Sequence, residues 1–119
     1  MIEALFAKNS VSLQLGLYRK DRNVAKNFRI FTHRNGGNLH LKLMGDFDGT
    51  SAHELLNTLK KGSAQVSRIF IHTNPLKNIH PFGLSVFHDN LGSLKDQCKR
   101  FIFTGHNAAQ FESAVRQFQ

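Results

Sequence analysis

The spacing of hydrophobic residues changes partway along this chain, and that change limits the folds available to it. Between residues 39 and 44, leucine alternates with histidine, lysine and methionine, which is the period of a half-buried β-strand. Between residues 52 and 59, apolar residues recur at i, i+3, i+4 and i+7, which is the period of an amphipathic helix. A strand followed closely by a helix, within 119 residues, favours a single α/β domain.

The rest of the chain continues this alternation of strands and helices. Residues 35–38 read Asn-Gly-Gly-Asn, a strong turn signal, so residues 28–31 and 39–44 are predicted to pair as a hairpin. A helix is predicted from Thr50 to Lys61, with Ser51 and Glu54 as its capping box. The other predicted elements are a strand at 11–17, a strand at 66–72, a helix from Pro81 through Leu94, a strand at 101–103 and a closing helix at 111–118.

The order of these elements predicts the fold class. Strands that alternate with helices after an initial hairpin form an α/β sheet whose later strands run parallel. We therefore expect a mixed, mostly parallel sheet of four to five strands, with an initial hairpin and surrounding helices. Residues 28–119 are predicted to form this domain, and residues 1–27 are predicted to be a basic extension or an added strand.

The sequence also bears on the compartment in which the protein works. No apolar run approaches the roughly 20 residues that a membrane-spanning helix needs. The first residues lack the basic and apolar regions of a signal peptide. The single cysteine, Cys98, fits a reducing environment. A cytoplasmic location is therefore expected.

The charge of the chain is strongly unbalanced. Its 16 Lys and Arg residues against 8 Asp and Glu residues give a formal net charge of +8. A basic balance favours an anionic partner, such as nucleic acid, acidic lipid headgroups or an acidic protein face. Residues 19–34 would carry such binding, but no known nucleic-acid motif accompanies them, so nucleic acid is the less favoured partner. The most basic stretch contains Arg19, Lys20, Arg22 and Lys26.

One stretch resembles a known family. Residues 43–55 read Leu-Met-Gly-Asp-Phe-Asp-Gly-Thr-Ser-Ala-His-Glu-Leu, which resembles the "G-E-L-D … a-x-x-L" signature at the first helix of STAS domains. These are sulfate-transporter and anti-sigma-factor-antagonist modules. Residues 69–71, 79–84 and 100–105 fall where the family has its central strand, its "D-S-S-G-L" helix start and its last strand. The resemblance covers about residues 28–117 and implies a STAS-like regulatory module of bacterial type that is not an enzyme and carries no cofactor.

The chain departs from the family at the position where some members are phosphorylated. Phe82 stands in place of the modified serine, Pro81 in place of the serine before it and His80 in place of the aspartate. His72 stands where the central strand of many members ends in another aspartate. Phenylalanine has no hydroxyl group, and the nearest serine, Ser85, lies about one helical turn further on. We therefore expect no phosphorylation at the family site and no phosphoserine switch.

The resemblance implies a protein-binding surface at two neighbouring segments. Phe82 would be its apolar anchor if exposed, or a core residue if buried, because aromatic residues occur in both places. The expected partner is an anti-sigma-factor or kinase-like protein, a component of a lipid or anion transporter that this chain would serve as accessory subunit, or a second copy of the chain. A basic domain that binds nucleic acid or a membrane surface is the alternative. The predicted partner-binding residues are Asp46, Asp48, Thr50, Ser51, His80, Pro81, Phe82 and Gly83.

Catalytic and metal-binding interpretations have less support. The Asp46–Gly49 turn lacks the spaced oxygen ligands of a calcium loop and the accompanying motifs of a kinase. His72, His80 and His88 lie eight residues apart, without the close pairs typical of zinc sites. Cys98 has no neighbouring catalytic signature. We predict no catalytic residue, no metal and no cofactor.

Overall fold

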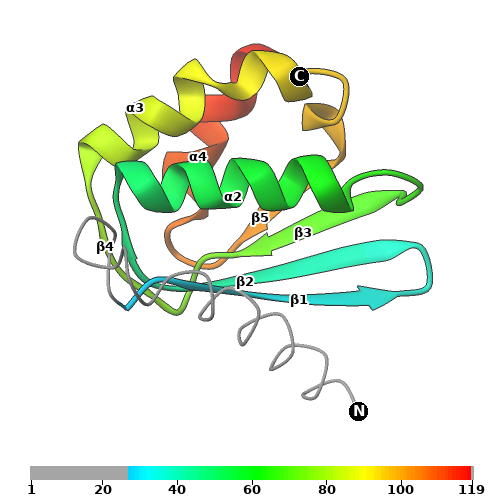
Figure 1. The fold of residues 1–119 in the computed structure, drawn as a ribbon, viewed down its shortest axis with the longest axis horizontal. Coiled ribbons are helices and arrows are strands. Elements are labelled where there is room, and N and C mark those ends of the chain that lie inside the picture. Colours follow the sequence, from blue (N-terminus) through cyan, green and yellow to red (C-terminus); the bar gives the residue numbers. More distant parts are fainter. Residues whose placement is uncertain (1–26, 119) are drawn as a thin grey trace.

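The computed structural model describes residues 27–118. Their strands form one mixed sheet with the path β1-β2-β3-β5, and β4 pairs with β2 beyond the end of β3. Figure 1 shows the arrangement. The elements are β1 (Arg29–Asn35), β2 (Asn38–Phe47), α2 (Gly49–Gly62), β3 (Arg68–His72), β4 (Leu76–Ile79), α3 (Pro81–Asp89), the 3-10 turns Leu91–Leu94 and Cys98–Arg100, β5 (Phe101–Thr104), α4 (Ala108–Val115) and the 3-10 turn Arg116–Phe118.

The sheet confirms the predicted mixed α/β architecture. β1 and β2 form the antiparallel hairpin around the glycine turn, and every other strand pair is parallel. β2 is long enough to have two parallel neighbours on the same side. β3 pairs with its residues 38–42, and β4 pairs with its residues 45–47. The carboxyl end of β2 is thereby held beside the start of α3.

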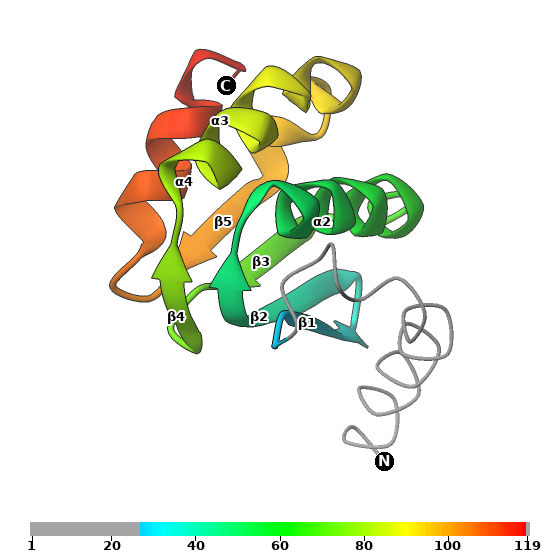
Figure 2. The same ribbon diagram turned by 60° about the vertical axis from the view of Figure 1, so that its left-hand side comes forward.

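The helices α2, α3 and α4 all lie on the same face of the sheet (Figures 1 and 2). The core lies between these helices and the sheet. Three fully buried rings from β2, α3 and α4 meet edge to face at its centre, with centroid separations of 5.0–6.4 Å. These rings are Phe47, Phe87 and Phe111. No described helix covers the opposite face of the sheet, which we call the open face.

Three local predictions were wrong. The N-cap of α2 is Asp48 and not Ser51, because the Asp48 side chain accepts the backbone N–H of Ser51. The helix that begins at Pro81 ends at Asp89, and the buried residues Leu91 and Leu94 belong to a 3-10 turn. The short strand β4 was missed, because its sequence Leu-Lys-Asn-Ile shows no alternation. The strand predicted at 11–17 lies outside the described residues, and the domain boundary near residue 27 stays a prediction.

Candidate partner-binding surface

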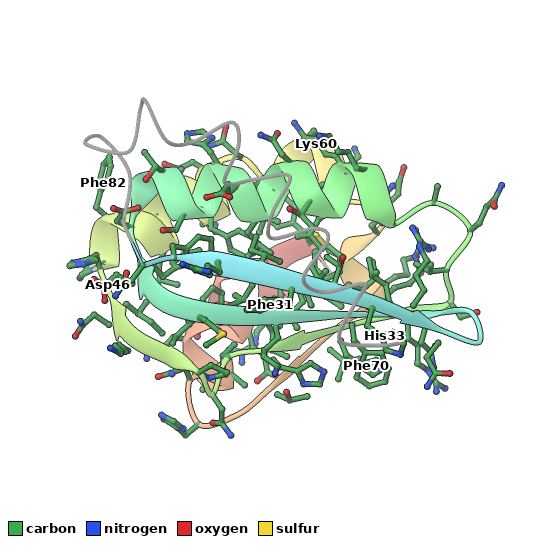
Figure 3. All side chains as sticks on the ribbon, turned by 60° about the horizontal axis from the view of Figure 1, so that its bottom comes forward. Phe31, His33, Asp46, Lys60, Phe70 and Phe82 are labelled. Carbon is green, nitrogen blue, oxygen red and sulfur yellow. The ribbon has the colours of Figure 1, made fainter. Side chains whose placement is uncertain are left out.

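Phe82 lies on the surface, in the first turn of α3. Its side chain is 71% exposed, and only Ile102 is also a large exposed hydrophobic residue among those that the structure describes. A Cβ atom added to Gly49 would lie 3.0 Å from Cε2 of Phe82, so the ring rests against the start of α2. Figure 3 shows Phe82 and Asp46 at the same end of the domain. The structure therefore places Phe82 outside the core, across the junction of two helix starts.

Gly83 allows the two helix starts to lie close together. It is buried, and a Cβ atom at this position would come within 2.8 Å of the Phe47 carbonyl oxygen and 2.9 Å of the Asp48 carbonyl oxygen. The backbone N–H of His80 also donates to the Phe47 carbonyl, at 2.9 Å. The absence of a side chain at Gly83 thus allows the first turn of α3 to approach the end of β2. Gly83 positions Phe82 but is not itself accessible to a partner.

Asp48 organises the turn between β2 and α2. Its Oδ1 atom accepts hydrogen bonds from the Ser51 backbone N–H at 2.9 Å, the Thr50 hydroxyl at 2.8 Å and the Ser51 hydroxyl at 2.9 Å. Partial burial acts to raise the pKa of this carboxyl, but the hydrogen bonds from Ser51 and Thr50 outweigh it and hold the pKa below its ordinary value. Asp48 therefore carries a negative charge at neutral pH, at the start of α2.

The other predicted residues divide into accessible and buried groups. His80 and Pro81 are exposed beside Phe82, and Asp46 is half-buried, with its Oδ1 accepting from Nδ2 of Asn78 at 2.8 Å. Ser51 is only 1% exposed, and its hydroxyl also lies 2.8 Å from the Asp46 carbonyl oxygen, to which it donates. The surface thus presents an aromatic ring at the same end of the domain as two carboxylates. Its accessible members are Asp46, Asp48, Thr50, His80, Pro81 and Phe82.

Sequence reasoning missed two contributors to this surface. Gly49 supplies the flat backbone against which the Phe82 ring rests, and Asn78 orients Asp46 from β4. The local sequence around Gly49 or Asn78 does not indicate either contact, because each contact joins segments about 30 residues apart. The basic residues between 19 and 26 lie outside the described residues.

Two other side chains named in the sequence analysis have different surroundings. His72 pairs with His40: its Nε2 lies 3.0 Å from Nδ1 of His40, and its Nδ1 lies 2.7 Å from the Thr104 hydroxyl oxygen. Across the described part of the chain, no group of three potential metal ligands comes together. Cys98 is buried, which raises the pKa of its thiol to about 11, and a protonated thiol is a poor nucleophile.

Solved structures share this fold. The chain is similar to a protein described as Mglu, with 18% sequence identity and a TM-score of 0.58 over 82% of this chain and 24% of that one. It is also similar to Mglu in its native form, with 15% identity and a TM-score of 0.53 over 78% of this chain and 28% of that one. This chain therefore spans only about a quarter of those proteins. At such identities the likeness shows the fold alone.

A third similar structure is a protein of the DUF3478 family from Shewanella loihica PV-4 with a SpoIIAA-like fold. It has 16% identity and a TM-score of 0.49 over 78% of this chain and 80% of that one. No protein-family model and no curated protein matches the chain. Within the described residues, no helix has the length and apolar character that crossing a bilayer requires.

Proposed function

We propose that this protein is a non-catalytic regulatory module that binds another protein through the surface around Phe82. The observation that carries the proposal is the 71% exposure of this ring at the junction of α2 and α3, at the same end of the domain as the carboxylates of Asp46 and Asp48. Aromatic residues are enriched among the residues that dominate protein–protein binding energy. The buried centres of protein interfaces are likewise enriched in aromatic residues, with polar residues around their rims.

The chemistry of the surface describes the partner that fits it. The ring requires an apolar pocket, and the carboxylates of Asp46 and Asp48 favour basic or hydrogen-bond-donating groups around that pocket. The resemblance to STAS domains favours an anti-sigma-factor or kinase-like protein, or a transporter component, as the protein that offers such a pocket.

The sequence at the helix start also bears on regulation. Phe82 cannot accept a phosphate, so the proposed binding is constitutive and independent of a kinase that modifies the family position. Ser85 is exposed on α3, but it lies one turn beyond the junction that Phe82 and Gly49 form. The amount of partner, and not the modification state of this chain, would then set the fraction bound.

Replacing Phe82 with Asp tests the proposal. The change puts a charge into the pocket that receives the ring, so affinity for the partner should fall at least about thirtyfold. The immobilised full chain is used to capture its partner from an extract of the source cell, and the purified partner is then titrated calorimetrically.

Ile102→Asp is the matched control, because Ile102 is the other exposed large hydrophobic residue of the described chain and lies on β5, on the open face. It should leave partner binding unchanged. Thermal unfolding of each variant is measured alongside. Equal capture by the Phe82→Asp variant and the unchanged chain would refute the proposal.

A further inference from the structure

The open face carries an ordered row of side chains that the proposed function does not use. The strand register aligns four residues, one from each of β1, β2, β3 and β5. The row reads His33, His40, Phe70 and Ile102. Figure 3 shows His33 and Phe70 on the side of the sheet away from Lys60 of α2, and toward the other end of the domain from Phe82.

A second row lies one pleat further along the same strands. Its members are Phe31, Lys42, His72 and Thr104, again one from each strand. The two rows together place aromatic and imidazole rings, one hydroxyl group and the cation Lys42 on a surface that is four strands wide. The buried side chains of the same strands on the helix-covered face are leucine, isoleucine and phenylalanine, without an imidazole or a cation, so the composition of the open face is not a requirement of the sheet itself.

The rings at the centre of the open face are parallel. The ring of His40 stacks on Phe70 with centroids 4.7 Å apart and planes 8° apart. The ring of His72 lies beside His40 in nearly the same plane, with centroids 5.3 Å apart and the ring edges joined by the 3.0 Å hydrogen bond between Nε2 of His72 and Nδ1 of His40. Phe70 and His72 are themselves within 7° of parallel. Such a stack, fixed by the strand backbone, is a preformed platform that a further flat ring can extend without reordering the side chains.

Charge on the strands is almost all positive. The described strands carry five cationic residues and only one acidic residue, Asp46, which Asn78 already engages. Three of the cations, Arg29, Lys42 and Arg68, alternate in register with buried neighbours and so belong to the open face. They surround the stacked rings on β1, β2 and β3.

We infer that the open face binds single-stranded nucleic acid, with bases stacked on the Phe70–His40–His72 platform and phosphates beside Arg29, Lys42 and Arg68. Sheets that bind single-stranded RNA use the same combination of rings on central strands and cations around them. The 2.7 Å hydrogen bond between the Thr104 hydroxyl and Nδ1 of His72 holds the edge of this platform in place. A duplex fits less well, because its bases are already stacked and their faces are hidden.

This surface is distinct from the proposed protein-binding surface. It lies on the sheet around Phe70 and uses cations, whereas the surface around Phe82 lies at the other end of the domain and combines the helix starts with Asp48 and with Asp46 at the end of β2. The two activities can therefore be removed separately, and either can fail without the other.

The test measures binding of the full chain to fluorescein-labelled oligo-U and oligo-dT of about 12 nucleotides by fluorescence anisotropy. Phe70→Leu keeps an apolar side chain but removes the ring, and should weaken binding about fivefold or more. Phe70→Tyr keeps the ring and should bind like the unchanged chain. Arg68→Ala should lower affinity for every sequence and reduce the salt slope of log K by about 0.7.

Three controls separate this surface from the rest of the chain. Arg116→Ala removes the same charge from the helix-covered side, and Phe82→Asp alters the proposed protein-binding surface; both should leave nucleic-acid affinity nearly unchanged. A variant with Arg19, Lys20 and Arg22 replaced by Gln tests the basic stretch before β1.

The inference is overturned by any of three results. These are absence of binding at about 50 mM salt, equal loss in Phe70→Leu and Phe70→Tyr, and loss confined to the variant of residues 19, 20 and 22. Circular dichroism melting of each variant is recorded, and Arg68→Ala keeps the test decisive if a Phe70 variant unfolds, because Arg68 is exposed.

Discussion

The two faces of the sheet are built from alternate residues of the same strands, yet they differ in polarity and charge. On β3, Ile69 and Ile71 are fully buried under the helices, whereas Arg68, Phe70 and His72 face the other way. The helix-covered face is aliphatic and aromatic. The open face combines rings, imidazoles and cations. One backbone therefore supports a face whose apolar side chains determine folding and a face of mixed polar and aromatic composition.

The difference shows which positions the fold depends on. The covered face needs apolar side chains at every second position, because each must be removed from water against α2, α3 or α4. The open face has no such requirement. Proteins with only 15–18% sequence identity to this chain share its fold, so the fold depends on the spacing of apolar positions more than on the identity of each residue. The rings and cations of the open face are not required for the sheet to form, which agrees with the proposed role of that face in binding nucleic acid.

Neighbouring substitutions on β3 should give the largest contrast between the faces. Ile69→Ala leaves a cavity in the core and should lower the free energy of unfolding by about 2–5 kcal/mol. Arg68→Ala, one residue away and exposed, should change it by about 0.5 kcal/mol or less. Urea unfolding of both variants measures the two values. Similar losses from the two substitutions would mean that the open face is also packed as core.

Adding one methyl group at Gly83, where α3 meets the end of β2, tests how closely the helix-covered side is packed. Gly83→Ala forces a Cβ atom against the Phe47 and Asp48 carbonyl oxygens, and this overpacking should cost about 1–3 kcal/mol of stability. It should also weaken partner binding, because the start of α3 must move. Gly92→Ala is the control, since nothing lies within 4 Å of a Cβ atom there. Equal melting temperatures for the two variants would contradict the close approach.

The sequence predicted the covered face well because its signal is periodic. The leucines of β2 and of α2 revealed the strand, the helix and the buried side of each. Elements without a period were placed less well: β4 was missed, and the end of α3 was placed too late. There the tertiary environment, and not local sequence, decides the conformation.

The binding surfaces were less predictable for a different reason. The positions around Phe82 were found through a family resemblance, but exposure of that ring depends on how α3 meets α2. The His40–His72 pair was missed, because it joins residues 32 apart in sequence. Only the register between β2 and β3 brings the two together, and a single sequence gives no direct measure of that register.

The smallest expected effect is a pH dependence that comes from the open face. Partial burial lowers the pKa of His40 below its ordinary value of 6.5, and the charge of His33 adds to this. Burial likewise lowers the pKa of His72, assisted by the charges of His40 and Lys42. The Thr104 hydroxyl faces the pair from β5 and carries no charge. Both imidazoles are therefore held neutral more strongly in the folded chain than in the unfolded chain.

The direction of the effect follows from proton uptake. Below pH 6.5 the unfolded chain binds more protons at these two residues than the folded chain does, so stability is full above that pH and falls as the pH drops toward the lowered pKa values. The loss is small because water reaches both rings and screens their charge. Urea unfolding of the full chain between about pH 7.5 and pH 5.5 measures it. His72→Gln should flatten the dependence, whereas His53→Gln, on exposed α2 surface, should not. A slope that is unchanged in His72→Gln would show that the pair does not couple protonation to folding.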